Sequence, residues 1–495
     1  MKFFKSIPQI HYFVLLTAFC AVFLKFWEPG IGLSSTTYGA FAANILNGQS
    51  LFNFRLGPGV FDPFVDHPPL IIWLQAASFW LFGVSAQILR LPSSILGVIA
   101  IFCTYWITRK RFSETAGVFS VLALLLINPF MNFTSSGWLD MGMVGFIMLG
   151  FAVFESFKDD RSKIKLALSG MLFAAALLSK GLAAMGLLPI AIYILCQRLR
   201  FSELLILAIS ALIPIALFDG LFYSVHHREF FSWYSERRET NAAEMARVYT
   251  DKADHLWYIK ALFTHSHIFF LAMLVGLFVF LKNRKSMRSG STAIVLLCLG
   301  EIALHSLVYG FTNKEYNQYI VPTFPWIAIL AGFGCAQLFK KADASKLAQR
   351  VATLSLLLFI AATLISTKIH MGEDNEVRAM ASTVAELKEL KQIRIASIPG
   401  NQHSWEGLAS YASWYLQLEP TLHNEDALTD KLQIFEAILV DKKVSSRQHA
   451  TILAKGYSLC LTTDLYRLYT DQSICNLERL SRITPISDSL GSFGR

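Results

Sequence analysis

Long apolar blocks separated by short polar segments constrain the fold of this chain more than any other feature. Each block runs for about 18–22 residues, the length that a helix needs to cross roughly 30 Å of hydrocarbon. The blocks explain why 54% of the 495 residues are hydrophobic and 16% are charged, whereas soluble domains carry about 25% charged residues. The sequence therefore predicts an α-helical polytopic membrane protein with about eleven membrane-spanning helices.

The order of the basic segments predicts how these helices are threaded. The first span, over 10–27, lacks a small-residue cleavage site, so we expect it to be retained. Every second connection that follows is basic, beginning with Arg109–Arg111, and basic connections stay in the cytoplasm. The N-terminus is therefore predicted to be cytoplasmic and the large loop at 224–260 to be exported. Further spans are expected over 91–107, 116–133, 141–157, 164–178, 183–195, 204–222, 261–281, 292–311, 320–338 and 352–366.

One apolar segment, 68–83, is short for a span at about 15 residues. Counting it as a span would also place Arg109–Arg111 and every later basic connection on the exported side. We therefore expect a helix along the outer membrane interface, started by proline at its first position and ended by Gly83. An ordinary span is the alternative.

The formal net charge of +9 does not indicate a nucleic-acid partner. The basic residues lie in short clusters between apolar blocks, where they set membrane topology. The seven cysteines include no Cys-x-x-Cys pair and no Cys/His metal spacing. Membrane lipids are thus the expected surroundings, and no nucleic acid is expected to bind.

The composition changes at about residue 371, after which charged residues recur and no span follows. Strands are expected over 393–398 and 437–440, helices over 407–416 and 445–454, and a hairpin from strands at 457–460 and 465–469. This alternation predicts a small α/β domain over 371–495, exported because an odd number of spans starts from a cytoplasmic N-terminus. Cys460 and Cys475 lie near the ends of the last strand pair, so a disulfide is feasible and two buried thiols are the alternative.

The first exported region, 28–90, concentrates ionisable side chains beside the predicted helical bundle. A carboxylate there would take the proton of a hydroxyl group, and a cation would stabilise a departing phosphate. A structured loop with surface charges is the alternative. Three of the residues could also bind a divalent metal, but such a trio in one loop is usually polar surface, so no cofactor is predicted. The candidates are Glu28, Asp62 and Asp66 as carboxylates, Arg55 and His67 as cations, and Tyr38, with Asp62, Asp66 and His67 as the metal trio.

Further candidates lie at the predicted outer ends of later spans. Asp140, at the outer end of the fourth span, is either a helix N-cap or a working carboxylate. Lys180 precedes a glycine at an outer helix junction, where it either meets an anionic group or snorkels to the interface. Lys314 and Tyr319 belong to a polar, aromatic cluster before a span that opens with two prolines.

Taken in order, these segments resemble the glycosyltransferase-C superfamily, in particular the protein O-mannosyltransferases and the lipid A aminoarabinose transferases. The resemblance covers about residues 10–340 and rests on short elements, whose order and placement carry more weight than any one of them. The elements are His67-Pro68-Pro69-Leu70, Phe82-Gly83, Arg90-Leu91, Asp140, Lys180-Gly181, and Tyr319 followed by Pro322 and Pro325.

The resemblance implies a transmembrane glycosyltransferase domain over 1–370 in a bacterial inner membrane. Members take a sugar from a polyprenyl-phosphate carrier and pass it, with inversion at the anomeric carbon, to an acceptor on the exported face. The acceptor would be a lipid, a protein or an envelope glycan. Asp140 would be an acidic residue of the site, and His67 and Lys180 would hold the carrier phosphate. The further candidates for substrate binding are Arg55, Arg90, Lys314, Tyr319 and Tyr38.

The first exported loop departs from the family in one respect. Members carry an Asp-Glu pair a few residues before a tyrosine, where this chain has Ser34–Thr37 before Tyr38. A hydroxyl holds its proton too tightly to act as a general base near neutral pH. Glu28, Asp62 or Asp66 replaces that carboxylate, Asp140 acts alone, or activity is lost or altered.

Two other functions therefore stay open. One is a non-catalytic family member that binds the carrier lipid or scaffolds a cell-envelope complex. The other is a transporter or flippase, for which internal repeats and charges near the bilayer midplane would be expected. No two halves of the sequence show matching patterns, and the candidate charges lie at the ends of spans.

Overall fold

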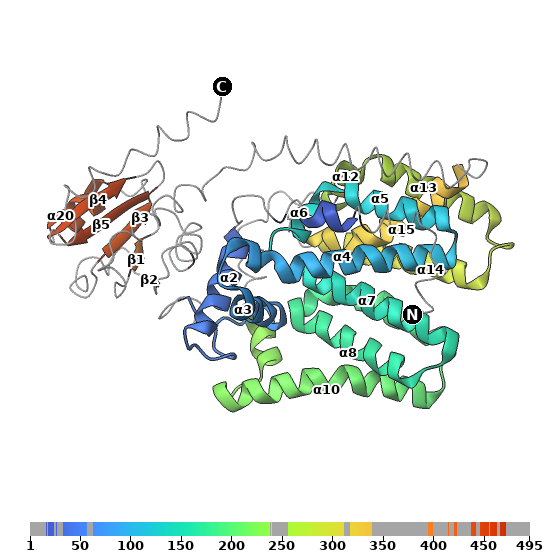
Figure 1. Cartoon of the computed structure of the whole chain (residues 1–495), viewed down its shortest axis with the longest axis horizontal. Coiled ribbons are helices and arrows are strands. Elements are labelled where there is room, and N and C mark those ends of the chain that lie inside the picture. Colours follow the sequence, from blue (N-terminus) through green and yellow to red (C-terminus); the bar gives the residue numbers. More distant parts are fainter. Residues whose placement is uncertain are drawn as a thin grey trace, which may run out of the picture. The chain divides into compact units, whose positions relative to one another are not determined.

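A computed structural model of the chain describes residues 33–56, 63–237, 256–310 and 317–338 (Figure 1). It also describes residues 16, 18–23, 26, 239, 395–398, 414, 420–422, 437–441, 446–454, 456–462 and 466–471. The described residues fall into two compact units, which we treat separately. The first lies within Met1–Glu28, Val65–Ser78 and Gln87–Ser366, and the second within Pro29–Phe64, Phe79–Ala86 and Thr367–Arg495.

The first unit is a bundle of long apolar helices. Among the described residues, 6 helices are long and apolar enough to cross a membrane, or up to 8 if each of two bent pairs is one span. The chain is thus a multi-span membrane protein, whereas the count of about eleven stays a prediction; the spans at 10–27 and 352–366 lie mostly or wholly outside the described residues. Its elements are α4 (Ala86–Arg111), α5 (Glu114–Leu126), α6 (Asn128–Thr134), α7 (Leu139–Asp160), α8 (Lys163–Lys180), η2 (Gly181–Gly186), α9 (Leu187–Leu195), α10 (Phe201–His226), α12 (Trp257–Ser266), α13 (Ile268–Asn283), α14 (Ser289–Gly310), η3 (Asn317–Tyr319), η4 (Val321–Thr323) and α15 (Phe324–Leu338).

Two of the predicted spans are broken. The span expected over 116–133 consists of α5 and α6, which meet at 76°, and the span over 261–281 consists of α12 and α13, which meet at 104°. The first break lies at Ile127, two residues before Pro129 in the first turn of α6; proline has no N–H to continue the helical ladder. The second lies at His267, whose φ is 40°. Main-chain groups freed at such breaks need protein partners within a membrane.

α8 and α9 are antiparallel helices, as predicted for two spans over 164–178 and 183–195. Lys180, at the end of α8, contacts Asp140 at the start of α7. Further along the chain, Tyr193 of α9 contacts Lys158 near the end of α7, with Nζ and Oη 2.9 Å apart. Because these two contacts lie at opposite ends of α7, the chain returns along α7 between Lys180 and Tyr193.

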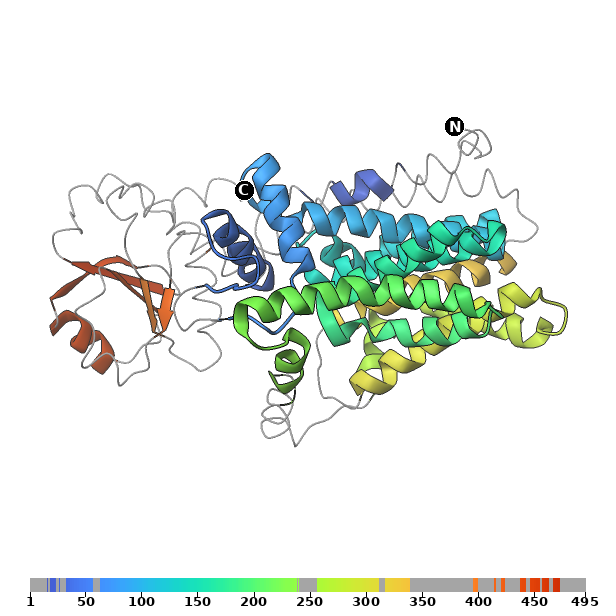
Figure 2. The same cartoon turned by 90° about the horizontal axis from the view of Figure 1, so that it is seen from below.

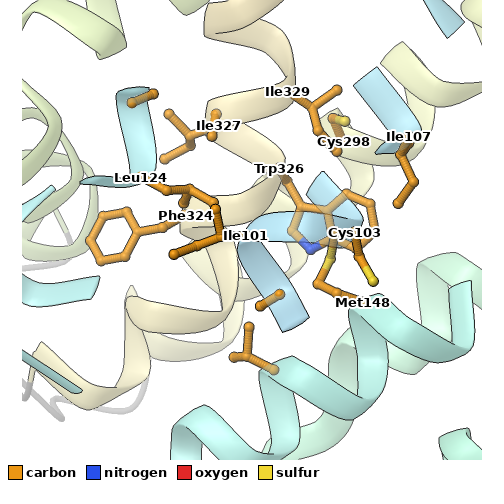
Figure 3. Close-up of a cluster of buried hydrophobic side chains, with 14 of the residues drawn as sticks. Ile101, Cys103, Ile107, Leu124, Met148, Cys298, Phe324, Trp326, Ile327 and Ile329 are labelled. Atoms are coloured by element: carbon orange, nitrogen blue, oxygen red, sulfur yellow. The ribbon is translucent and has the colours of Figure 1, made fainter. Parts of the chain in front are cut away.

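The core of the bundle lies around α15. Figure 3 shows Trp326 of α15 among buried side chains of neighbouring helices, including Cys103 of α4, Met148 of α7 and Cys298 of α14. By contrast, α10 packs on α8 at one edge of the bundle (Figure 1), where it lies in front in the view from below (Figure 2), and most of its side chains are exposed. An apolar helix that is exposed in this way is suited to face lipid.

Two glycines allow α15 to approach its neighbours closely. A Cβ on Gly332 would lie 2.3 Å from the main-chain oxygen of Ala116 in α5. A Cβ on Gly334 would lie 1.9 Å from the main-chain oxygen of Ala272 in α13. Small residues at such crossings let helix backbones pack closely where lipid removes the hydrophobic driving force between helices.

The segment before α4 forms a short helix, α3 (Leu70–Phe82), of 13 residues. At 1.5 Å per residue it is too short to cross a bilayer. It begins directly after Pro69, so the two prolines precede the helix and do not occupy its first turn as expected. It ends at Gly83, whose φ of 83° is the left-handed conformation of a glycine cap. The short helix and its glycine end are confirmed, and its place at the outer interface stays a prediction.

The second unit contains α2 (Leu33–Leu46) and a five-stranded sheet with the order β2-β1-β3-β5-β4. β1 pairs in parallel with β2 and β3, and β5 pairs antiparallel with β3 and β4. The strands and the helix that follows β3 are β1 (Ile395–Ile398), β2 (Pro420–Leu422), β3 (Ala437–Asp441), α20 (Ser446–Ala454), β4 (Tyr457–Thr462) and β5 (Tyr466–Asp471).

The predicted strands and final hairpin of the tail lie where the sequence pattern places them, and β2 is an addition to that pattern. The helix expected over 407–416 lies outside the described residues except at residue 414. Cys475 also lies outside them, so the disulfide with Cys460 stays a prediction. The same holds for the proposal that 371–495 is a separate exported domain.

Candidate functional site

A buried ion pair joins α7 and α8 at one end of the bundle. Lys180 Nζ contacts Asp140 Oδ1, and the two side chains are only 3% and 2% exposed. Asp140 lies in the first turn of α7 and Lys180 is the last residue of α8. Because the two helices form a hairpin, the start of one meets the end of the other. Each charge also opposes the partial charge of its own helix end, which favours this placement.

The position of each residue excludes its simpler structural interpretation. The N-cap of α7 is Trp138, and no side chain bonds to that cap, so Asp140 is not the N-cap. Lys180 is buried and paired, so it does not snorkel to an interface. The second carboxylate oxygen of Asp140, Oδ2, has no hydrogen-bond partner among the described residues. This oxygen is a candidate proton acceptor. Buried unpaired charge is costly in a membrane protein, so an oxygen of this kind usually has a function.

The turn before Asp140 is held by side chains from α3 and α4. Gln75 Nε2 donates to the main-chain oxygen of Gly137 at 2.9 Å, and Ser93 Oγ donates to that of Trp138 at 3.1 Å. Two residues after Asp140, a Cβ on Gly142 would lie 2.2 Å from Ile71 Cδ1. α3 therefore packs directly on the first turn of α7, which carries Asp140.

A helical segment at 230–237, which follows α10, packs on the start of η2, directly after Lys180. The Leu182 N–H donates to Tyr234 Oη at 3.1 Å, and a Cβ on Gly181 would lie 2.6 Å from the same oxygen. Arg237 Nε lies 3.5 Å from Asp66 Oδ1. This segment therefore connects the loop that carries Asp66 with the turn that follows Lys180, and all of these residues belong to the first unit.

The other predicted site residues of the first unit have different environments. His67 is half-buried beside Asp66. Arg90 is 3% exposed, and its Nη1 donates to the main-chain oxygen of Phe26 at 2.8 Å, a contact between α4 and the segment predicted as the first span. The ring of Tyr319 stacks on that of Tyr309, with centroids 4.4 Å apart.

The remaining predicted site residues lie in the second unit or outside the described residues. Arg55 and Tyr38 belong to the second unit, where Asn44 of α2 donates to the Arg55 main-chain oxygen at 3.0 Å and Tyr38 packs on Phe64. Glu28, Asp62 and Lys314 lie outside the described residues, as does one member of the expected metal trio. The described residues contain no group of three or more His, Cys, Asp or Glu side chains that could hold a metal.

Several residues of this region escaped the sequence analysis. Gln75, Tyr234 and Arg237 reach the site through packing, and no local pattern marks them. Glu301 and His305 carried a signal, because both stand inside an apolar block, and ionisable residues at membrane depth are functional candidates by default.

Known proteins resemble this chain in sequence and in fold. Residues 66–220, which include Asp140 and Lys180, match the family model described as dolichyl-phosphate-mannose-protein mannosyltransferase. The fold is similar to that of ArnT from Cupriavidus metallidurans bound to undecaprenyl phosphate, with a TM-score of 0.66, 14% identity, and coverage of 94% of this chain and 98% of that one. This chain has the glycosyltransferase-C fold.

A second solved structure is similar in fold, with a lower TM-score. The archaeal oligosaccharyltransferase AglB from Archaeoglobus fulgidus, in complex with an inhibitory peptide and a dolichol-phosphate, has a TM-score of 0.52 and 12% identity. The similarity covers 94% of this chain and 74% of AglB. The predicted fold is thus confirmed.

Two proteins of Aquifex aeolicus (strain VF5), both called uncharacterized, are similar in sequence. Each is 24% identical to this chain, over 271 and 297 residues. These regions cover 54% and 56% of this chain, and 60% and 54% of the two relatives. This chain therefore spans less than two thirds of the length of the curated relatives that it matches.

Proposed function

We propose that this protein is an integral-membrane glycosyltransferase that moves a sugar from a polyprenyl-phosphate carrier to an acceptor on the exported face of a bacterial inner membrane. The observation that carries the proposal is the buried Asp140–Lys180 pair, inside the region that matches the mannosyltransferase family model. The complexes of ArnT with undecaprenyl phosphate and of AglB with a dolichol-phosphate support a polyprenyl phosphate as the carrier.

The pair suits an inverting displacement. The acceptor oxygen would attack the anomeric carbon from the side opposite the carrier, and the bond from that carbon to the phosphate oxygen would break. The phosphate would leave with the bonding electrons, and Lys180 would stabilise its charge. The acceptor proton would pass to the Asp140 carboxylate, whose Oδ2 has no partner among the described residues.

Binding of the carrier would also weaken the ion pair between Asp140 and Lys180. Without an anion nearby, Asp140 and Lys180 neutralise each other. A carrier phosphate competes for the Lys180 ammonium, and this competition frees the carboxylate to accept a proton. His67 and Arg237, which lie beside Asp66, are the further groups that we expect to meet the phosphate. The other candidates for substrate contacts are Arg55, Arg90, Lys314, Tyr319 and Tyr38, and Glu28, Asp62 and Asp66 are the alternative carboxylates.

A second candidate function is carrier binding without turnover. The observation that favours it is the absence of an Asp-Glu pair in α2, where the side chains of Ser35, Thr36 and Thr37 are buried. A protein of this kind would bind a polyprenyl phosphate and release it unchanged. The transfer assay below separates the two functions, because binding with no transfer over a panel of sugar donors supports the second.

The test is transfer of a labelled sugar from polyprenyl-phosphate donors by the full chain purified in detergent. Asp140→Asn removes the proton acceptor but keeps the shape, so we expect transfer to fall by about 10²–10⁴-fold. The matched control is Asp160→Asn at the other end of α7, where the carboxylate pairs with Lys165 and is largely exposed; it should leave transfer unchanged. Full transfer by the Asp140→Asn protein would refute the assigned role.

A further inference from the structure

An apolar groove with a volume of about 430 Å³ lies between α8, α9 and α10. Every side chain that lines it is apolar, and each helix contributes at least one alanine: Ala174 on α8, Ala191 on α9, and Ala208 and Ala211 on α10. These small side chains leave the space open. Ala191 and Ala208 are exposed and Phe173 of α8 is buried, so the groove opens at the surface of the bundle and has its floor on α8.

Contacts outside the groove fix its walls. A Cβ on Gly170 of α8 would lie 2.5 Å from the main-chain oxygen of Leu207 in α10, so these two helices are in close contact. On the other side, Tyr193 Oη of α9 donates to Glu155 Oε1 of α7 at 2.6 Å. The groove is therefore preformed, and a ligand can bind in it with little rearrangement of the helices.

The groove extends over part of the thickness of a bilayer. Its lining residues run from Leu187 to Leu195 on α9 and from Leu204 to Ala211 on α10. At about 1.5 Å per residue these stretches are about 12 Å and 10 Å long, and one leaflet contributes about 15 Å of hydrocarbon. The α10 stretch begins directly after Glu203, which pairs with Arg161 at the basic end of α7. The groove therefore faces the acyl chains of a single leaflet, the one at that end of the bundle.

The free charges at this end of the groove are positive. Residues 196–203 connect the last lining residue of α9 to the first lining residue of α10. This connection carries Arg198 and Arg200, which are both exposed, and its single acidic residue, Glu203, pairs with Arg161 at 3.2 Å. Exposed guanidinium groups beside an apolar groove favour a ligand that joins a hydrocarbon chain to a phosphate.

We propose that this groove binds one acyl chain of an anionic phospholipid, and that Arg198 and Arg200 bind the phosphate of its headgroup. A polyprenyl-phosphate carrier also joins a hydrocarbon chain to a phosphate. Its phosphate would here lie at the opposite end of α7 from the Asp140–Lys180 pair, so the phospholipid is the better occupant. Binding of this lipid does not depend on the proposed transferase activity.

The test is native mass spectrometry of the full chain, delipidated in detergent and titrated with phosphatidylglycerol or with phosphatidylcholine of the same acyl chains. We expect one phosphatidylglycerol molecule to bind each chain at least about tenfold more tightly than phosphatidylcholine, because two arginines favour the net negative headgroup. Arg198→Gln/Arg200→Gln should abolish this preference and leave phosphatidylcholine binding unchanged.

Filling the groove should weaken the binding of both lipids. Ala208→Phe places a ring in the space for the acyl chain, and each methylene group that loses its apolar surroundings weakens binding about fourfold. We therefore expect a loss of at least about tenfold. If Ala208→Phe does not fold, Ala191→Phe on the opposite wall replaces it.

Matched controls make the result specific. Ala216→Phe makes the same change at an exposed position of α10 outside the groove, and Arg284→Gln/Arg288→Gln removes two exposed arginines from the connection between α13 and α14. Both proteins should bind phosphatidylglycerol as the wild type does. Equal affinity of the wild type for the two phospholipids would overturn the proposal, and so would equal losses in Ala208→Phe and Ala216→Phe. Complete displacement of phosphatidylglycerol by an equimolar amount of undecaprenyl phosphate would show that the groove binds a carrier lipid instead.

Discussion

Asp140 and Glu155 are two buried carboxylates on the same helix with opposite environments. Glu155 contacts Arg111, accepts a hydrogen bond from Tyr193 Oη at 2.6 Å and lies 3.2 Å from Lys158 Nζ. Asp140 has the single ion pair with Lys180, and its Oδ2 is unpartnered among the described residues. A fully satisfied carboxylate stabilises the fold, whereas a half-satisfied one can still accept a proton.

The Asp140–Lys180 pair should show strong coupling in stability. Removing one partner leaves a buried charge alone, which costs about 3–5 kcal/mol, whereas removing both leaves none. We therefore expect Lys180→Met to unfold at a lower temperature than the Asp140→Asn/Lys180→Met double variant. Thermal unfolding of the four proteins of this cycle in detergent measures the effect. Additive changes would show that the pair does not form.

The corresponding experiment on Glu155 distinguishes a structural from a catalytic carboxylate. Glu155→Gln should lower the unfolding temperature, since Arg111 and Lys158 lose their buried counter-charge. The sugar transfer rate per folded molecule should remain the same, because Glu155 lies at the end of α7 opposite Asp140. A loss of transfer as large as that of Asp140→Asn, without a change in stability, would contradict this assignment.

The helices are held together by close backbone contacts at glycine. The break at Ile127 and the break at His267 bend α5–α6 and α12–α13 by 76° and 104°. α15 passes between α5 and α13, where Gly332 and Gly334 leave no space for a side chain. Bent helices packed on a central straight one thus form the bundle that carries the site.

A methyl group at the α15–α13 contact should be destabilising. The Cβ of Gly334→Ala would lie 1.9 Å from a main-chain oxygen, so the helices must move apart, at a cost of about 1–3 kcal/mol. Gly220→Ala in α10 is the matched control, because its Cβ meets nothing within 4 Å and alanine favours a helix by about 1 kcal/mol. Thermal unfolding should show a lower unfolding temperature for Gly334→Ala and no decrease for Gly220→Ala. Equal unfolding temperatures of the two variants would refute the close contact at Gly334.

The helical bundle of the first unit has two chemically different ends. One end of α7 carries the neutral Asp140–Lys180 pair, and the other lies among Arg109–Arg111, Lys158 and Lys165. Basic ends of membrane bundles face the cytoplasm, which would leave the candidate site on the exported side. This orientation is the condition on which the proposed reaction depends.

Cysteine accessibility tests the orientation directly. The test uses a protein with its native cysteines replaced. Lys163→Cys lies at the basic end of the bundle, and Ser235→Cys lies on the segment 230–237, which contacts η2; both positions are exposed. We expect an impermeant maleimide to label Ser235→Cys and Ala450→Cys in intact cells, and Lys163→Cys only after permeabilisation. Labelling of Lys163→Cys and Ser235→Cys from the same side would exclude the predicted threading.

Local pattern was enough to predict much of this protein. Hydropathy and charge are properties of consecutive residues, so they marked the apolar spans, the short α3 with its end at Gly83, and the strands of the tail. The order of short elements also indicated the glycosyltransferase-C fold. Each of these features follows from the length of an apolar block or from a side-chain period.

Which side chains meet was decided only by the tertiary structure. The sequence offered Asp140 and Lys180 as separate candidates, and the antiparallel packing of α7 and α8 made them one buried pair. Other contacts buried Arg90 against the main-chain oxygen of Phe26 and placed Glu301 and His305 beside Gly186. Contacts between distant residues depend on how helices cross, and no local property of the chain encodes a crossing.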